Sequence, residues 1–217
     1  TASLTGLVCD NYAKRPVAVM MASDPIARPL SGIGQADIVV EMPVTPSGIN
    51  RLMAVYQCGD PSEIGSIRSA REDFIPLAAG LNAIYAHWGG EKNALSQLDN
   101  HVIDNIDGLK FDGTVFYRKK GIPMPHNGFT NPNRLIEQSK KFDYPLESKF
   151  AGYNHKTTEK PKNISNITEE IVLSYPAPYD VRWTYDISLQ RYKRFRNNRP
   201  EIDRNTNDQL SSKTVII

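Results

Sequence analysis

The stretch IGSIRSAREDF, residues 64–74, places Arg68 and Arg71 on either side of Ser69. A guanidinium group can donate two parallel hydrogen bonds to a carboxylate or a phosphate. Ser69 is followed three residues later by Glu72, the S-x-x-E pattern of a helix start, and the free N–H groups of a helix N-terminus favour a bound anion. The stretch therefore predicts an anion site, although internal salt bridges would explain the same arginines equally well. The nearby carboxylates are Glu41, Glu72 and Asp73.

Polar residues also stand at the ends of three predicted strands. Glu41 ends one strand, Arg51 opens the next, and His87 ends a third. Strand ends in a parallel or mixed sheet gather along one edge, where α/β proteins usually bind ligands. We expect Arg51, Arg68 and Arg71 to contact the anion, Glu41 to orient them, and His87 to lie at the rim. A satisfied, partly buried histidine is an alternative explanation for His87.

His126 and Asn127 complete the predicted ligand-binding site. They stand between Pro125 and Gly128, so the chain there is restricted and could close over the site. The rigidity of the turn alone explains the pair equally well. No residue is predicted to be catalytic.

Several motifs that would identify a specific cofactor, metal or catalytic site are incomplete in this sequence. The glycines at residues 32–34 precede a strand and lack the third glycine of a dinucleotide loop, and Ser69 has no G-x-S-x-G context. Residues 203–214 lack the glycine and the final glutamate of a calcium loop. The H-x-x-x-E spacing of His87 and Glu91 begins at a strand end, which would not hold a metal. We therefore predict no cofactor and no metal.

Buried strands and short helices must position these residues. Apolar runs that predict strands occupy residues 17–21, 37–41, 51–58 and 83–87. One helix is expected at 70–81, with a kink or a late start caused by Pro76, and another at 91–98. Thr130 or Asn131 is expected to cap a third helix. This alternation predicts a mixed α/β layer up to about residue 145.

The second half of the chain has a different pattern of polar and apolar residues. The polar segment 154–163 predicts a linker between an N-terminal domain at 1–153 and a C-terminal domain at 164–217. Short β-like runs follow at residues 171–175, 179–185, 191–196 and 213–217. The predicted fold class is α+β: a mixed β-sheet flanked by helices, followed by a smaller antiparallel β-rich module.

Charge is distributed unevenly between the halves. Residues 1–110 carry a net charge of −4 and residues 111–217 a net charge of +6. The run RYKRFRNNR, residues 191–199, interleaves basic and aromatic side chains and could bind nucleic acid or another polyanion. A β-hairpin in which Tyr192 or Phe195 packs and the basic side chains face solvent explains the same pattern with fewer assumptions.

The composition is that of an ordinary soluble globular protein. No apolar run approaches the ~20 residues of a membrane span, and no basic-then-apolar signal segment opens the sequence. The two cysteines, Cys9 and Cys58, allow either one disulfide or two free thiols.

Taken together, these motifs resemble the YerB-like family of secreted lipoproteins of Gram-positive bacteria. In the first half the similar segments are LTGL (4–7), RPVAVM (15–20), ARPLSGIGQADIVVE (27–41), GINRLMAVYQ (48–57), IGSIRSAR (64–71), AIYAHWGG (83–90) and PHN (125–127). In the second half they are WTYD (183–186) and RYKRFRNNRPEID (191–203). The resemblance covers nearly the whole chain.

The resemblance implies an N-terminal mixed α/β domain, a smaller C-terminal β-rich domain, a location outside the cytoplasmic membrane on a lipid anchor, and no assigned activity. The family's lipid-bearing cysteine lies upstream, so neither Cys9 nor Cys58 inherits that role. The family's polar pair after the first strand is replaced here by Met21-Ala22-Ser23-Asp24, so a site using that loop would be altered.

We expect a non-enzymatic protein that binds an anionic small molecule, a wall fragment or an envelope protein, with no nucleic acid. Membrane contact would come only through the anchor. The alternative is a hydrolase or transferase acting on a cell-wall-related substrate with Glu41 or His87 as acid/base.

Overall fold

The computed structural model describes residues 1–46, 48–155 and 167–217. Within the predicted linker, only residues 154 and 155 are described, and the remainder of that segment lies outside the described residues.

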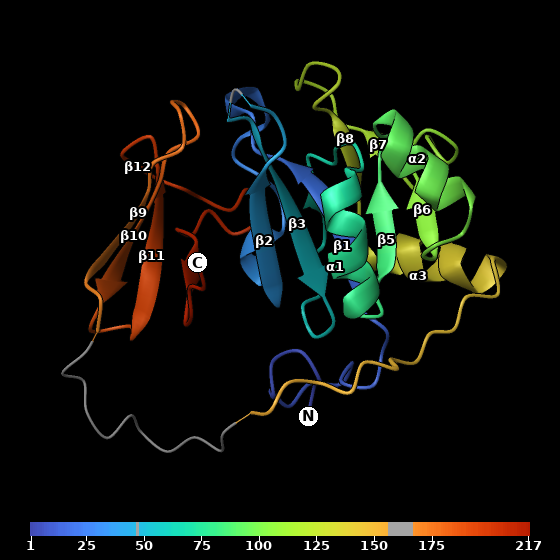
Figure 1. Cartoon of the computed structure of the whole chain (residues 1–217), viewed down its shortest axis with the longest axis horizontal. Coiled ribbons are helices and arrows are strands. Elements are labelled where there is room, and N and C mark those ends of the chain that lie inside the picture. The colour runs from blue at the N-terminus through green and yellow to red at the C-terminus, as the bar shows by residue number, and fades with distance from the viewer. Residues whose placement is uncertain (47, 156–166) are drawn as a thin grey trace.

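A five-stranded mixed sheet forms the centre of the N-terminal half (Figure 1). Its strands, in spatial order, are β2 (Ile38–Pro43), β3 (Asn50–Tyr56), β1 (Val17–Ala22), β5 (Ile84–His87) and β6 (Asn105–Asp107). The strands β2, β3 and β1 are antiparallel neighbours, whereas β5 and β6 run parallel to β1. Every residue of β1, β3 and β5 is buried, which explains why these strands read as continuous apolar runs.

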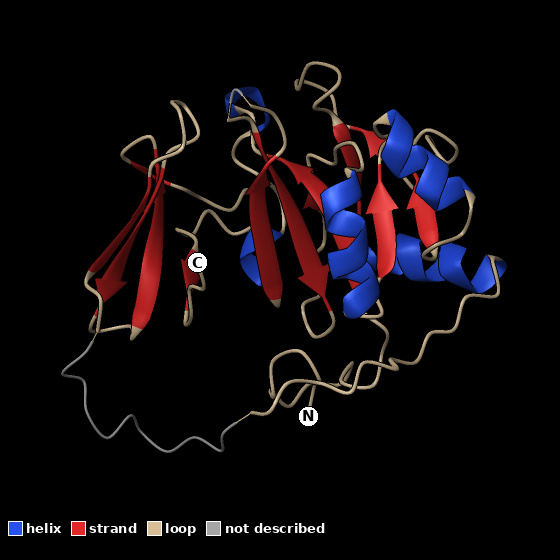
Figure 2. Cartoon of the chain, in the orientation of Figure 1, coloured by secondary structure: helices blue, strands red, loops and turns tan. Residues whose placement is uncertain are grey.

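Helices bury both faces of this sheet (Figure 2). The helices α1 (Ile75–Gly80) and α2 (Lys92–Asp99) pack on one face, and α3 (Pro132–Lys141) packs on the other. The side chain of Asn131 accepts a hydrogen bond from the N–H of Arg134 at 2.9 Å, as expected for a helix cap.

The prediction of a helix at 70–81 is wrong for the first half of that range. The chain makes a 3₁₀ turn at Glu72–Phe74, and α1 starts only at Ile75. Pro76 lies in the first turn of α1, where its missing N–H costs no helical hydrogen bond. The late start that Pro76 predicted is therefore confirmed.

The C-terminal half forms a separate antiparallel sheet in the order β12 (Arg199–Pro200), β11 (Arg191–Arg196), β10 (Val181–Asp186) and β9 (Glu170–Leu173). The short strand β13 (Ser211–Ser212) also pairs with β11. The strand expected at 213–217 is absent from the described residues, because the chain leaves the sheet after Ser212. The predicted α+β fold class is confirmed.

A third, small sheet lies at one end of the central sheet. It consists of β4 (Ile64–Gly65), β8 (Gly128–Thr130) and β7 (Tyr117–Arg118), in that order. The loop between β7 and β8, residues 119–127, carries His126 and Asn127.

The C-terminal segment docks onto a glycine loop of the N-terminal half. Asp203, which is 1% exposed, accepts hydrogen bonds from the N–H groups of Gly32 at 3.3 Å and Gly34 at 2.7 Å. Arg204 donates to the carbonyl of Pro29 at 2.8 Å. The carboxylate of Asp203 thus satisfies the N–H groups of Gly32 and Gly34, and these two donors in turn satisfy the buried carboxylate.

A disulfide joins Cys9 to Cys58, with 5.8 Å between their Cα atoms. It ties the N-terminal lead to the end of β3, where the Gln57 side chain also binds the carbonyls of Tyr12 and Lys14. Of the two alternatives for the cysteines, one disulfide or two free thiols, the structure therefore shows the disulfide.

The double variant Cys9→Ser/Cys58→Ser should unfold more easily, because the bond closes a loop spanning 49 positions of the unfolded chain. Chain entropy predicts a loss of about 2–4 kcal/mol in the free energy of unfolding. Urea denaturation measures this loss. A reductant should shift the midpoint of the wild type and leave that of the double variant unchanged, and equal midpoints for the two oxidised proteins would contradict the prediction.

Candidate functional site

Sheet register places Arg51 and Ser66 on either side of Ala22. Ala22 pairs with Arg51 across β1 and β3. On the other side of β1, the N–H of Ala22 donates to the carbonyl of Ser66 at 3.0 Å, and the N–H of Arg68 donates to Met20 at 2.9 Å. Residues opposite one another in a ladder project to the same face. Ala22 is small, so the long side chain of Arg51 can extend across it.

We define the arginine cluster as Arg51, Arg68, Asp24, His126 and Tyr179. Asp24 lies at its centre, with Oδ2 at 3.2 Å from Nη1 of Arg51 and 3.9 Å from Nδ1 of His126. The hydroxyl of Tyr179 donates to Oδ1 of Asp24 at 3.4 Å. Residues from β3, the segment after β4, the β7–β8 loop and the C-terminal half therefore meet at one end of the central sheet.

Several polar atoms in and beside the cluster are buried without a hydrogen-bond partner among the described residues. They are Nε of Arg51, Nε of Arg68, Nδ1 of His126 and Oγ of the adjacent Ser66. The side chain of Arg51 is only 5% exposed, and Ser66 is fully buried. Proteins pair the large majority of buried polar atoms, so four unpaired atoms at one end of a sheet need an explanation.

The electrostatics of the cluster are also unbalanced. Burial lowers the pKa of Arg51 to about 10, with Arg68 contributing in the same direction and Asp24 opposing. Burial likewise lowers the pKa of Arg68, against the effect of Asp24. Burial and the neighbouring Arg68 lower the pKa of His126, which keeps its imidazole neutral near pH 7. Two guanidinium groups thus share one carboxylate.

Arg71 and Ser69 lie beside the cluster and differ from expectation. Arg71 pairs with Glu91, whose Oε2 is 3.7 Å from Nε of Arg71. The other oxygen of Glu91 accepts the N–H of Glu72 at 2.9 Å, so an internal carboxylate occupies the helix start where an anion was predicted. Ser69 is not the helix cap, because the capping position belongs to Arg71.

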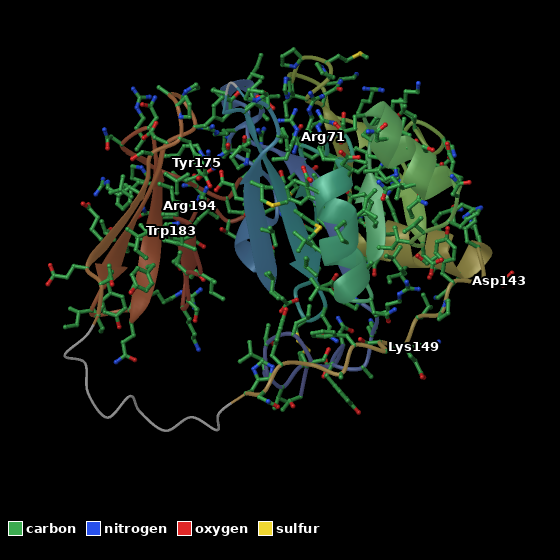
Figure 3. All side chains as sticks on the ribbon, viewed as in Figure 1. Arg71, Asp143, Lys149, Tyr175, Trp183 and Arg194 are labelled. Atoms are coloured by element: carbon green, nitrogen blue, oxygen red, sulfur yellow. A yellow bond between two sulfur atoms is a disulfide. The ribbon has the colours of Figure 1, made fainter. Side chains whose placement is uncertain are left out.

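Glu41 is not the residue that orients the cluster. Its carboxylate accepts hydrogen bonds from Arg194 at 2.6 Å, Arg196 at 2.7 Å and the Asn50 side chain at 3.0 Å. Glu201 binds the same two arginines from the other side. Figure 3 shows Arg194 on the face of the C-terminal sheet that is turned toward β2. We call Glu41, Arg194, Arg196 and Glu201 the buried ion-pair network.

This network removes Glu41 as a general base. Burial alone would raise the pKa of Glu41, but Arg194 and Arg196 outweigh burial and lower it to about 2. A carboxylate held by three donors at such a pKa does not accept a proton near neutral pH. The hydrolase or transferase hypothesis based on Glu41 is therefore not supported.

His87 and Asn127 are engaged elsewhere. His87 is 1% exposed, with Nδ1 at 2.8 Å from the carbonyl of Gly89 and Nε2 at 3.3 Å from Oδ1 of Asn105. Asn127 accepts a hydrogen bond from Arg118 at 3.0 Å. The structure therefore fits the alternative explanation for both residues, which is a satisfied histidine and a fixed turn.

The basic run at 191–199 also differs from expectation. Arg194 and Arg196, expected to be solvated, are 7% and 3% exposed, and Lys193 pairs with Asp186 at 2.6 Å. Guanidinium groups already matched by internal carboxylates are not available to a polyanion.

Neither of the two surface depressions that stand out among the described residues involves the arginine cluster. One is lined by residues such as Pro76 and Val102, and the other by residues such as Arg15 and Asn82. The β7–β8 loop lies against the cluster instead, with the carbonyl of Pro125 at 3.5 Å from Nη1 of Arg68. In the described parts of the chain, no group of three or more potential ligand side chains is arranged for a metal, and no helix is long and apolar enough to cross a membrane.

Sequence reasoning missed three contributors to this site. Asp24 lies in the loop that replaces the family's polar pair. Its position directly after the first strand, where polar residues were expected to gather, could have indicated that it belongs to the site. Ser66 could have been found from its position two residues before Arg68. Tyr179 comes from the other half of the chain, and no local pattern points to it.

Comparisons with known proteins identify the class. Residues 4–145 match the family described as "Protein of unknown function (DUF3048) N-terminal domain", and residues 171–217 match the DUF3048 C-terminal domain. The chain, a mixed sheet joined to an antiparallel C-terminal sheet, belongs to the DUF3048 family.

A relative in Bacillus subtilis (strain 168) is named "Putative lipoprotein YerB". The identity is 32% over 219 residues, covering the whole of this chain but only 66% of the relative, slightly less than two thirds of its length. A crystal structure of YerB from Bacillus subtilis matches with a TM-score of 0.85 and 30% identity, over 97% of this chain and 71% of that one. The resemblance noted from the motifs is confirmed.

Replacing Glu41 by Gln should destabilise the protein in a pH-dependent way. The pKa of Glu41 is lowered from 4.5 to about 2 in the folded state, so its contribution is present above pH 4.5 and is lost as the pH falls toward 2. A shift of this size corresponds to about 3 kcal/mol. Denaturant melts should show that deficit at neutral pH, shrinking as the pH falls below the usual carboxylate range.

Glu170→Gln is the matched control, because Glu170 is 52% exposed and pairs with Arg182 at the surface. Its effect should stay below about 1 kcal/mol. A Glu41→Gln deficit that does not change with pH would contradict the role assigned to the Glu41 charge.

Proposed function

We propose that the arginine cluster binds a small anionic ligand in a protein of the cell envelope. The observation that carries this proposal is the group of unpaired, buried polar atoms around Arg51 and Arg68. Arginine Nε and Nη groups donate only, so they call for an acceptor, and the excess positive charge calls for an anion. A wall fragment or the carboxylate-bearing segment of an envelope protein fits this chemistry.

The location is inferred from two further observations. The Bacillus subtilis relative is named "Putative lipoprotein YerB", and that name supports a location on a lipid anchor outside the cytoplasmic membrane. The disulfide between Cys9 and Cys58 supports the same location, because disulfides persist mainly in oxidising compartments.

The energetics of the free protein support binding rather than a purely structural role. Burial lowers the pKa of both Arg51 and Arg68, so their charged forms are held in place at a cost. An anion placed against both groups would offset that cost. Functional sites commonly retain such locally unfavourable groups at the expense of stability.

Entry to the site requires the β7–β8 loop to move. The contacts described between this loop and the rest of the cluster are long: 3.5 Å from Pro125 to Arg68 and 3.9 Å from His126 to Asp24. Long contacts of this kind contribute little, so the segment 120–126 can shift at low cost. The ion pair between Lys119 and Glu63 at 2.6 Å and the hydrogen bond from Arg118 to Asn127 at 3.0 Å hold the two ends of the loop.

The variant Arg68→Gln should lose anion binding without losing stability. A charge-assisted hydrogen bond contributes roughly 1.5–3 kcal/mol, so the affinity for benzoate or phenyl phosphate should fall at least about tenfold. NMR titrations that follow the Nε–Hε signals of the arginines measure this directly, because the free Nε atoms of Arg51 and Arg68 would acquire an acceptor. The free energy of unfolding should not fall, since the buried charge is removed.

Arg199→Gln serves as the control, because Arg199 is an exposed arginine far along the chain in β12. It should bind both anions as the wild type does. Equal affinity in Arg68→Gln and the wild type, or a loss of several kcal/mol in stability, would show that Arg68 is structural.

Anion binding should strengthen as the pH falls, through His126. The pKa of His126 is lowered in the free protein by burial and by Arg68. A bound anion would raise that pKa, so binding takes up a proton and affinity increases from about pH 8 to about pH 5.5. In His126→Asn this increase should be reduced, and an identical pH profile in both proteins would exclude His126 from the site.

A further inference from the structure

We infer that Asp24 acts as a built-in counter-ion that makes the arginine cluster selective for a monoanionic carboxylate over a phosphate dianion. This inference rests on the proposed function of the cluster and concerns the class of ligand that it takes.

Asp24 occupies the position that an anionic ligand would otherwise share. Its carboxylate contacts Nη1 of Arg51 at 3.2 Å, receives the hydroxyl of Tyr179 at 3.4 Å and lies 3.9 Å from Nδ1 of His126. Nη1 of Arg51 is therefore already engaged, whereas Nε of the same guanidinium group has no partner. A ligand meets a site that is partly filled by the protein's own carboxylate.

The loop around Asp24 keeps that carboxylate in place. The hydroxyl of Ser23 donates to the carbonyl of Asn50 at 2.7 Å, and Arg28 donates to the carbonyl of Ser23 at 3.0 Å. A 3₁₀ turn at Pro25–Ala27 follows directly. Because its neighbours on both sides are tied down, Asp24 cannot easily swing away to make room for a second strong anion.

Counting charges then defines the ligand. Arg51 and Arg68 carry two positive charges, Asp24 carries one negative charge, and His126 is neutral near pH 7. Arg71 is paired with Glu91, and the charges that act on Arg28 are the four of the buried ion-pair network, so neither arginine is counted with the cluster. The net charge of the cluster is therefore +1, and one bound monoanion brings it to zero. A dianion would leave an uncompensated negative charge in a buried place beside Asp24, which is unfavourable.

The free donors match a carboxylate as well. Nε of Arg51, Nε of Arg68 and Oγ of Ser66 are three donors for the two oxygens of a planar carboxylate. Such a carboxylate can belong to a free small acid or to the C-terminus of a peptide. These two sources share the same chemistry at the site and differ only in what lies beyond it.

Benzoate and phenyl phosphate form a matched pair of probes with the same ring and different anions. At about pH 7.5 the phosphate monoester is mostly dianionic, because its second pKa is about 6. The wild type should bind benzoate more tightly than phenyl phosphate. In Asp24→Asn the ratio of the two affinities should shift toward phenyl phosphate by at least about tenfold, because one negative charge has left the site.

The outcomes separate this inference from the proposed function. Tighter binding of phenyl phosphate by the wild type would overturn the inference and leave anion binding intact, and that comparison needs no variant. An unchanged ratio in a folded Asp24→Asn protein would also overturn it. If neither probe shifts the Arg51 and Arg68 signals, the proposed function fails and the inference fails with it.

The source of the carboxylate is tested with acetylated trialanine carrying either a free or an amidated C-terminus. Binding of the free form alone supports carboxylate recognition. If it also binds at least about tenfold more tightly than benzoate, the peptide C-terminus is the better ligand, and otherwise a free acid is. Equal binding of the amidated form would contradict the inference.

Discussion

Two carboxylates and two guanidinium groups, buried between the two sheets, connect the halves of this protein. Glu41 belongs to an edge strand of the central sheet, and Glu201, Arg194 and Arg196 belong to the C-terminal half. Taking four charges out of water is expensive, and it is tolerated only when every charge is matched at hydrogen-bond distance. The network therefore specifies one docking position for the C-terminal sheet far more strictly than apolar contact would.

That docking position also builds the candidate site. Nη1 of Arg196 donates to the carbonyl of Tyr179 at 3.1 Å, and the hydroxyl of Tyr179 reaches Asp24. The arginine cluster thus includes a residue whose backbone carbonyl accepts a hydrogen bond from the network. Asp203 and its glycine loop secure the same two halves at a second point.

The two groups of arginines differ in how well their charges are matched by carboxylates. Arg194 and Arg196 face two carboxylates, and Glu41 and Glu201 raise the pKa of Arg194 against the effect of its burial. Arg51 and Arg68 face one carboxylate, and their pKa values are lowered. The matched pair connects the two halves, whereas the unmatched pair leaves an excess of positive charge at one end of the central sheet. Membership in the DUF3048 family and similarity to YerB do not supply a partner for that charge, so the chemistry of the cluster is the best available guide to it.

The sequence by itself determined the strands β1, β3 and β5, because long apolar runs act within a few residues. It also narrowed the cap of α3 to Thr130 or Asn131 and predicted that Pro76 would kink or delay α1, and the structure uses Asn131 and the late start. It further predicted that polar residues at strand ends would gather at one edge of the sheet, and of these the structure brings Arg51 and Arg68 together but engages Glu41 and His87 elsewhere. Only the tertiary structure decided which carboxylate each arginine meets. Glu41 pairs with residues about 150 positions away, Cys9 finds Cys58, and Arg194 is buried rather than solvated. Such choices depend on contacts between segments that are distant in the sequence, and these contacts produce no periodic pattern from which they could be predicted.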